Sequence, residues 1–280
     1  MSGILYLVAT PIGNLEDMTF RGVRVLEEVD LIAAEDTRNS IKLLNHFKIK
    51  TPMTSYHEHN KYEKAAELVR KLSEGINIAL ITDAGTPGIS DPGEELVRQC
   101  YESGITVIPI PGACAAINGL IASGLPTRRF AFEAFLPSDK KERRNVLEEL
   151  ATETRTIVIY EAPHRLLKTL KELKACLGDR NITICRELTK KHEAFFRTTL
   201  KESTEYYEQT DPKGECIIVI NGISREVLEE EKHHRWDSMT IPEHIQMYIE
   251  KGMEKKEATR QVALDRGVPK REIYEYSKNL

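Results

Sequence analysis

Residues 76–93 read INIALITDAGTPGISDPG, and this stretch decides the fold class. The apolar, uncharged run from Ile76 to Thr82 has the length and composition of a buried β-strand. It passes directly into a stiff loop of glycine, proline, aspartate and serine, and a helix is expected from about Glu94. Open α/β sheets bind ligands at the carboxyl ends of their strands, so the loop is a candidate binding element. A purely structural connection, in which Asp91 or Gly93 caps the helix, is equally compatible with this composition.

The same alternation of strand and helix extends through the first half of the chain. Strand-like apolar runs lie at Ile4–Ala9, Leu31–Ala34 and Ile105–Ile110, and amphipathic segments separate them. One such segment, which includes Lys61, ends at Gly75, a typical residue for a helix stop. Strands that alternate with helices in this way predict an α/β fold with a parallel sheet that is buried on both faces.

A second group of strands and helices begins at Phe130. Its expected elements are a short aromatic strand, a helix near Glu142–Leu150, a helix after Pro163, and strands at Thr156–Tyr160, Ile182–Arg186, Ala194–Leu200 and Glu215–Asn221. The last three strands lie close together in the sequence, which favours a mixed sheet. A turn-forming stretch around Gly124 marks the expected boundary. The predicted organisation is therefore an α/β domain at 1–124, a second at 125–223, a charged linker at 224–240 and a helical tail at 241–280.

Composition limits the possible partners and compartments. The 40 Lys and Arg residues against 44 Asp and Glu give a net charge of −4, so an RNA partner would need a local basic patch. The five cysteines are scattered without a C-x-x-C pair, which favours a reducing cytoplasm and argues against a disulfide framework or a metal site. No signal peptide is expected. Residues 105–125 carry no charge, but Pro109, Pro111 and Gly112 favour a strand, a turn and a helix over a membrane span.

Six segments carry a family resemblance. They are Val8–Leu15, Ala34–Arg38, Ser55–Asn60, Asp83–Gly93, Tyr160–Arg165 and Arg186–Lys190. Together, and in this order, they resemble the bacterial 16S ribosomal RNA cytidine 2′-O-methyltransferases of the tetrapyrrole methylase superfamily. The resemblance extends to the end of the second predicted domain. It implies a fold of two α/β domains with S-adenosyl-L-methionine in the cleft between them, a homodimer, and no metal.

The resemblance also implies which residues bind the cofactor. By position in the superfamily's motifs they are Pro11, Ile12, Gly85, Thr86, Ile89, Cys114, Ala115, Tyr160 and Cys216. Two of them depart from the usual pattern, because many relatives have Asp in place of Thr86 and a hydroxyl residue in place of Cys114. Cys114 would then contribute mainly packing and backbone contacts.

Methylation of a ribose 2′-oxygen requires that the hydroxyl lose its proton, and three residues are candidates for the base. His57 belongs to a His-Glu-His cluster, and histidine is the side chain most often used as a base near neutral pH, while Glu35 and Glu161 follow strands whose ends would face the cleft. Each also has a structural interpretation. The His57 loop would cap the following helix, Glu161 would cap the helix behind Pro163, and Arg38 or Arg165 would form ion pairs.

Two basic segments are candidates for RNA contact. The first is Lys140, Lys141, Arg143 and Arg144, at the start of a helix, although such charge runs are usually solvated faces. The second lies in the tail, where residues 256–276 show the rhythm of a helix, a glycine turn and a helix that is typical of helix-turn-helix modules; Lys270 and Arg271 open its last helix. Alternatively, the tail is a helical cap that packs Val262, Leu264 and Ile273 on the body.

The function that these expectations support is S-adenosylmethionine-dependent 2′-O-methylation of a cytidine in 16S rRNA, either in free RNA or in the small ribosomal subunit. Two alternatives stay open at this point. A methyltransferase of a cyclic tetrapyrrole, such as a precorrin, would share the fold and the cofactor but would not need a helical tail that binds RNA. An RNA-binding ribosome assembly factor would retain the cleft without catalysing a reaction.

Overall fold

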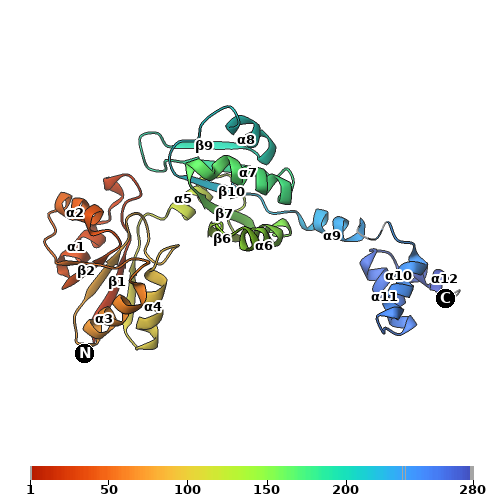
Figure 1. Cartoon of the computed structure of the whole chain (residues 1–280), viewed down its shortest axis with the longest axis horizontal. Helices are drawn as coiled ribbons and strands as arrows, with labels where there is room; N and C mark the ends of the chain where they lie inside the picture. Colours follow the sequence, from red (N-terminus) through yellow and green to blue (C-terminus); the bar gives the residue numbers. More distant parts are fainter. Residues whose placement is uncertain (1, 235, 237, 278–280) are drawn as a thin grey trace. The chain divides into compact units, whose positions relative to one another are not determined.

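A computed structural model of the chain describes residues 2–234, 236 and 238–277 (Figure 1). The described residues fall into two units. The first unit runs to Leu150 and continues over Arg155–Asn221, and it contains both sheets. The second comprises Ala151–Thr154 and the chain from Gly222 onward.

The first sheet is parallel throughout. Its strands are β1 (Ile4–Val8), β2 (Leu31–Ala34), β3 (Met53–Ser55), β4 (Ile78–Ile81) and β5 (Thr106–Ile110), in the order β3-β2-β4-β1-β5. The parallel α/β arrangement predicted from the alternation is therefore confirmed. Strand β3 was not predicted, because three half-buried residues carry no recognisable alternation and pair only through their neighbour β2.

Helices cover both faces of this sheet (Figure 1). On one face, α1 (Phe20–Glu28) and α2 (Thr37–His46) bury Leu26 and Leu44 in one apolar cluster. On the other, α3 (Lys61–Ser73) and α4 (Gly93–Glu102) bury Leu68 and Leu96 in a second cluster. A 3-10 turn, η1 (Leu15–Asp17), precedes α1. The loops that leave the carboxyl ends of the strands therefore gather at one edge of the sheet.

The second sheet is mixed, as the sequence predicts. It contains β6 (Phe130–Phe135), β7 (Thr156–Glu161), β8 (Asn181–Arg186), β9 (Ala194–Thr199) and β10 (Cys216–Ile220), in the order β6-β7-β10-β8-β9. Strands β6 and β7 pair in parallel and every other pair is antiparallel.

Four helices pack on the second sheet. On one face, α6 (Lys140–Ala151), α7 (Pro163–Leu177) and α8 (Leu200–Tyr207) bury leucines such as Leu147 and Leu170. On the other, α5 (Ala115–Ala122) packs Ala116 and Leu120 against the strands. The predicted boundary at Gly124 falls after α5, yet α5 contacts β7 and β10 of the second sheet. Residues 105–125 consist of β5, a turn and α5, as the sequence analysis proposed. Within the described residues, none of the helices combines the length and the apolar character needed to cross a membrane.

The second unit is helical. It contains α9 (Arg225–His234), which lies in the segment predicted as a charged linker, followed by α10 (Ile241–Glu250), α11 (Lys255–Asp265) and α12 (Lys270–Ser277). The last three helices enclose a small core of Ile245, Ala258, Val262 and Ile273. Leu264, which the cap interpretation placed in a packed face, is instead 62% exposed. Helices α11 and α12 thus form a helix-turn-helix arrangement that packs, together with α10, around an apolar core of its own.

The structure corrects the prediction for Arg143. Its side chain is buried rather than displayed for RNA, because it occupies the inner face of α6. The guanidinium group donates to Glu172 Oε2 at 2.6 Å, to Thr169 Oγ1 at 2.7 Å and to the carbonyls of Leu136 and Pro137. These contacts attach α6 to α7 and give Arg143 a structural function.

We therefore expect Arg143→Met to destabilise the protein by about 3 kcal/mol, because it removes the buried donor that the carboxylate of Glu172 and the hydroxyl of Thr169 share. Urea denaturation measures this difference. Arg144→Met is the matched control, since Arg144 is exposed and pairs only with Glu148 on the same helix. Equal denaturation midpoints for the two variants would show that the buried network contributes nothing.

Candidate functional site

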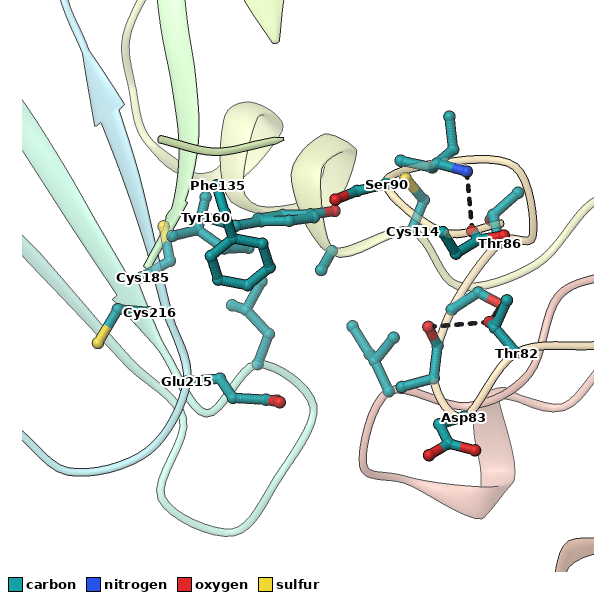
Figure 2. A pocket seen from close by; sticks show the side chains of 18 of the residues that line it. Thr82, Asp83, Thr86, Ser90, Cys114, Phe135, Tyr160, Cys185, Glu215 and Cys216 are labelled. Atoms are coloured by element: carbon teal, nitrogen blue, oxygen red, sulfur yellow. Dashed lines mark hydrogen bonds between the residues drawn. The ribbon is translucent and has the colours of Figure 1, made fainter. Parts of the chain in front are cut away.

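A pocket of about 350 Å³ lies in the first unit and is lined by residues from both sheets (Figure 2). Its lining comprises Ile12, Glu35, Thr82, Asp83, Ala84, Gly85, Thr86, Ile89, Ser90, Asp91, Cys114, Ala115, Phe135, Tyr160, Glu161, Cys185, Glu187, Leu188, Lys190, Glu215, Cys216 and Ile217. A cavity of this size, apolar with a few convergent polar groups, is typical of a small-molecule site.

Backbone hydrogen bonds shape the side of the pocket that belongs to the first sheet. The N–H of Thr10 donates to the carbonyl of Gly85 at 2.9 Å, and the N–H of Gly85 donates back to the carbonyl of Thr10 at 3.1 Å. The Thr10 hydroxyl donates to the carbonyl of Thr82. Gly85 has a φ of 86°, and a Cβ there would lie 3.3 Å from Ile12. The glycine is therefore required both by its backbone conformation and by the close approach of the two loops.

The loop at residues 83–93 is held by its own carboxylate and by a neighbouring loop. Asp91 accepts hydrogen bonds from the N–H groups of Gly88, Ile89 and Gly93, at distances of 2.8–3.0 Å. The hydroxyl of Thr86 donates to the carbonyl of Ala113 at 2.9 Å. The N-cap of α4 is Pro92, so the prediction that Asp91 or Gly93 caps this helix was wrong by one residue. Asp91 orders the turn before α4, and the loop lines the pocket.

Aromatic rings form the side that belongs to the second sheet. The ring of Tyr160 packs against Phe132 and Phe135 with centroids 5.0 and 5.6 Å apart, and Figure 2 shows Phe135 and Tyr160 together at the pocket. The Tyr160 oxygen accepts a hydrogen bond from the N–H of Ala116 at 3.0 Å. Burial raises the pKa of Tyr160 to about 12, so its hydroxyl stays neutral. The rings provide a surface on which a flat, neutral ligand group can stack.

The first sheet also contributes carboxylates. Glu35 follows β2 and accepts a hydrogen bond from the N–H of Asp83 at 3.3 Å. Burial raises the pKa of Glu35, and the negative charges of Asp83, Asp91 and Asp36 raise it further against the opposing effect of the Asp83 N–H. This part of the pocket is therefore suited to a cationic ligand group and holds a carboxylate that takes up a proton more readily than usual.

Glu187, Lys190 and Glu215 form the opposite rim. The Lys190 Nζ lies 3.0 Å from Glu187 Oε1 and 3.5 Å from Glu215 Oε2. Burial alone would lower the pKa of Lys190, but the two carboxylates outweigh it and raise the pKa. Figure 2 shows Glu215 and Asp83 on different sides of the pocket.

Glu161 lines the pocket but is fully engaged by its neighbours. Its carboxylate accepts from the Thr169 hydroxyl at 2.5 Å and from the N–H of Ala162 at 2.9 Å, and it pairs with Arg165 at 3.3 Å. The side chain has no exposed surface. The ion pair proposed for Arg165 is confirmed. The helix cap itself is Ala162, so the prediction of Glu161 at that position was wrong by one residue.

Two residues that the sequence assigned to the site do not line the pocket. Pro11 precedes the lining residue Ile12, and His57 lies in the loop between β3 and α3. The N–H of His57 donates to Asn60 Oδ1 at 2.8 Å, which supports a structural function for this loop at the start of α3. Arg38 pairs with Asp36 and lowers the pKa of that carboxyl to about 2, so it too forms the ion pair proposed as an alternative.

The three pocket cysteines, Cys114, Cys185 and Cys216, are free thiols. Burial raises the pKa of both Cys185 and Cys216 to about 12, and the two thiols donate to backbone carbonyls of Gly119 and Gly214. Over residues 2–234, 236 and 238–277, no group of three or more His, Cys, Asp and Glu side chains is arranged to hold a metal ion.

The structure thus brings most of the predicted residues together. Of the residues assigned to the cofactor, Pro11 alone is absent from the lining, and Glu35 and Glu161 of the candidate bases are present. Sequence reasoning did not single out Phe135, Asp83 or the Glu187–Lys190–Glu215 group. Glu187 and Lys190 fall inside a quoted motif, which was the available signal. Phe135 had no such signal, because an aromatic residue at a strand end looks like core.

Comparisons with known proteins agree on the family and the fold. A sequence model described as tetrapyrrole (corrin/porphyrin) methylases matches residues 4–204. The chain is 54% identical over 272 residues to ribosomal RNA small subunit methyltransferase I of Halalkalibacterium halodurans, which covers 97% of this chain and 93% of that protein. It is 51% identical to the protein of the same name from Synechocystis sp., with 99% and 98% covered.

Solved structures share the fold at low sequence identity. Diphthine synthase superposes with a TM-score of 0.60 and 15% identity, and covers 78% of this chain and 90% of that one. A uroporphyrin-III C-methyltransferase from Thermus thermophilus, complexed with S-adenosyl homocysteine, gives a TM-score of 0.53 at 20% identity, with 78% and 97% covered.

Glu35→Gln should raise the melting temperature at pH 7, because ionised Glu35 is partly buried beside other carboxylates. The pKa of Glu35 is higher in the folded than in the unfolded protein, so the folded state binds the proton more tightly. The free energy of unfolding of the wild type therefore rises as the pH falls through the folded-state pKa. The difference between variant and wild type should therefore vanish below the ordinary glutamate pKa of 4.5. Thermal unfolding at pH 7 and pH 4 measures it. Glu27→Gln, at an exposed position, is the control. An effect of Glu35→Gln that does not change with pH would contradict a raised pKa of Glu35.

Proposed function

Since the chain belongs to the tetrapyrrole (corrin/porphyrin) methylases and, within them, to the ribosomal RNA small subunit methyltransferases I, we propose that it transfers a methyl group from S-adenosyl-L-methionine to the 2′-oxygen of a cytidine ribose in 16S rRNA. The identity of 49–54% with relatives of that name, over 97–99% of the chain, is the observation that carries the proposal.

The pocket suits the cofactor chemically. Tyr160, Phe135, Cys114 and Ala115 supply a mostly apolar wall for an adenine ring. The carboxylates of the first sheet, Glu35 among them, match the positive sulfonium and ammonium groups. In this proposal the cofactor is held by Ile12, Gly85, Thr86, Ile89, Cys114, Ala115, Tyr160 and Cys216, while Pro11 acts only by directing the backbone into Ile12. When bound, S-adenosylmethionine supplies an electrophilic methyl group on a sulfonium.

Among the three predicted bases, Glu35 is the one whose surroundings fit the task. It lines the pocket, and burial raises its pKa toward the pH at which a base works well. Glu161 is committed to Arg165 and Thr169, and His57 is outside the lining. We therefore assign the acceptance of the 2′-hydroxyl proton to Glu35, and a structural function to the other two.

RNA contact is assigned to two exposed basic groups. The exposed face of α6 carries Lys140, Lys141 and Arg144. Arg143, the fourth residue predicted to contact RNA on this helix, is buried and is left out. Lys270 and Arg271 open α12 of the helical module and are exposed. The family model ends at residue 204, whereas several rRNA methyltransferase relatives, such as the Synechocystis protein, match over 97–99% of the chain, which favours an RNA-related function for the module.

The remaining assignments concern assembly and location. Ile117 and Ile121 are 42% and 65% exposed on α5, on the side that does not pack on the second sheet. An exposed apolar pair of this kind suits a contact with a second copy, so we assign a homodimer, which light scattering tests. The scattered free cysteines fit a cytoplasmic enzyme.

Product analysis tests the function. The wild-type chain is incubated with methyl-labelled S-adenosylmethionine and, separately, with 16S rRNA, small ribosomal subunits and a precorrin-type tetrapyrrole. Nuclease digestion and mass spectrometry should recover 2′-O-methylcytidine from one of the RNA samples. Label in the tetrapyrrole, or on a nucleobase, would overturn the proposal. RNA binding without any label would favour an assembly factor.

Ala115→Phe should weaken binding of S-adenosylhomocysteine by at least about tenfold, because the added ring fills the pocket beside Tyr160. Isothermal titration calorimetry measures the affinity. Ala66→Phe, on the exposed face of α3, is the control and should bind normally. Unchanged affinity in a folded Ala115→Phe protein would place the cofactor elsewhere.

Lys270→Glu should lower the affinity for 16S rRNA and reduce the slope of log affinity against log salt by about one, since one phosphate contact and its released counterion are lost. Filter binding over a salt series measures both quantities. The same change at Lys201, exposed on α8, serves as the control. If the two variants bind alike, the start of α12 does not contact RNA.

A further inference from the structure

Lys190 stands apart from the rest of the pocket by its charge. Among the described lining residues it is the one lysine or arginine, and six carboxylates surround the same cavity. S-adenosylmethionine carries a sulfonium and an ammonium, which match carboxylates, and one carboxylate of its own. Two groups can therefore face Lys190, the carboxylate of the cofactor and an oxygen of the second substrate.

The burial of its neighbours places Lys190 where that substrate arrives. The side chain of Glu161, deep in the pocket, has no exposed surface, whereas Lys190 is 32% exposed and Glu215 is 82% exposed. Lys190 thus lies, like Asp83, Ile89 and Phe135, at the part of the lining that reaches solvent. An RNA nucleotide is too large to share a cavity of about 350 Å³ with the cofactor, so its ribose has to enter where the lining reaches solvent.

The ammonium is held in a fixed position. Its aliphatic chain lies across Gly13, where a Cβ would come within 2.3 Å of Lys190 Cγ, and Gly13 has a φ of 149°. Its Nζ is anchored by Glu187 and Glu215. The loop itself is strained, since Glu187 and Thr189 have φ values of 51° and 66°. Strain of this kind in non-glycine residues is concentrated at functional sites.

The two anchors leave part of the ammonium free. A lysine ammonium has three donor hydrogens, and Glu187 and Glu215 account for two. Because the carboxylates keep its pKa raised, Lys190 is protonated at neutral pH and cannot act as the base. It can donate a hydrogen bond to an oxygen that becomes negative.

We propose that Lys190 is a catalytic residue that donates a hydrogen bond to the 2′-oxygen of the substrate ribose and stabilises its developing negative charge. This rests on the proposed function. In the step, the O–H bond of the 2′-hydroxyl breaks and its proton passes through a water molecule to the Glu35 carboxylate on the opposite side of the pocket. The oxygen forms a bond to the methyl carbon as the carbon–sulfur bond breaks and its electron pair returns to sulfur. The Lys190 ammonium keeps its proton throughout.

Lys190→Met tests this assignment, because methionine keeps an unbranched chain over Gly13 and removes the charge. The single-turnover rate on 16S rRNA should fall about 100-fold, the scale seen when one donor to a developing oxyanion is lost. Part of the loss should be regained at pH 9, where hydroxide assists deprotonation. The affinities for S-adenosylhomocysteine by calorimetry, and for RNA at one fixed salt concentration, should stay within about twofold, a margin well below the tenfold change that corresponds to 1.4 kcal/mol.

Two further variants make the result specific. Lys190→Arg retains the charge and should keep the rate within about tenfold of the wild type, less than the loss expected when the donor is removed. Lys191→Met removes a charge at the exposed neighbouring position and should change nothing. A Lys190→Met rate within threefold of the wild type would overturn the proposal. So would a loss confined to cofactor affinity, or to RNA affinity with a normal rate. If the wild-type chain forms no 2′-O-methylcytidine, the proposed function fails before any variant is compared.

Discussion

The pocket depends on one short backbone contact, the pair of hydrogen bonds between Thr10 and Gly85. The loops after β1 and β4 leave neighbouring parallel strands at the same edge, and their peptide groups must find partners once they are removed from water. Pairing them with each other satisfies both loops and brings Ile12 beside Gly85. The bond from Thr86 to the carbonyl of Ala113 attaches the third loop to this pair. The rigidity of the binding surface therefore comes from backbone, and a side chain at position 85 would separate the loops.

The two sheets contribute different charged groups to the pocket. The first sheet contributes Glu35 with its raised pKa, and the second contributes an ammonium held between two carboxylates. Transfer of a methyl group from a sulfonium to a hydroxyl removes one positive charge and releases one proton. In the proposed mechanism a carboxylate that accepts the proton and a cation that stabilises the oxygen are complementary to that change, and both are held on separate loops before the reaction starts.

The sequence predicts much of the fold and part of the site. Strands with continuous apolar runs, such as β4, are evident because they are buried on both faces, whereas β3 is too short to produce a pattern. The loop at 83–93 can be recognised in the sequence from its content of glycine, proline, aspartate and serine. Arg143 and Arg144 look equivalent in sequence, yet one is buried and the other exposed, because the difference depends on which face of α6 meets α7. Phe135 and Lys190 reach the pocket through tertiary packing, which local patterns do not encode.

The charged side chains behind the pocket pair with one another. Arg143 donates to Glu172 and to the Thr169 hydroxyl, and that hydroxyl donates to Glu161, which also pairs with Arg165. Arg143, Arg165 and Lys168 thus pair with the two carboxylates, so neither carboxylate is left without a cation. Because Glu161 lies on the pocket lining and Arg143 on α6, the network connects the wall of the pocket to the helical layer behind the second sheet. Glu161 is consequently a fixed part of that wall, which agrees with the proposal that a carboxylate of the first sheet accepts the proton.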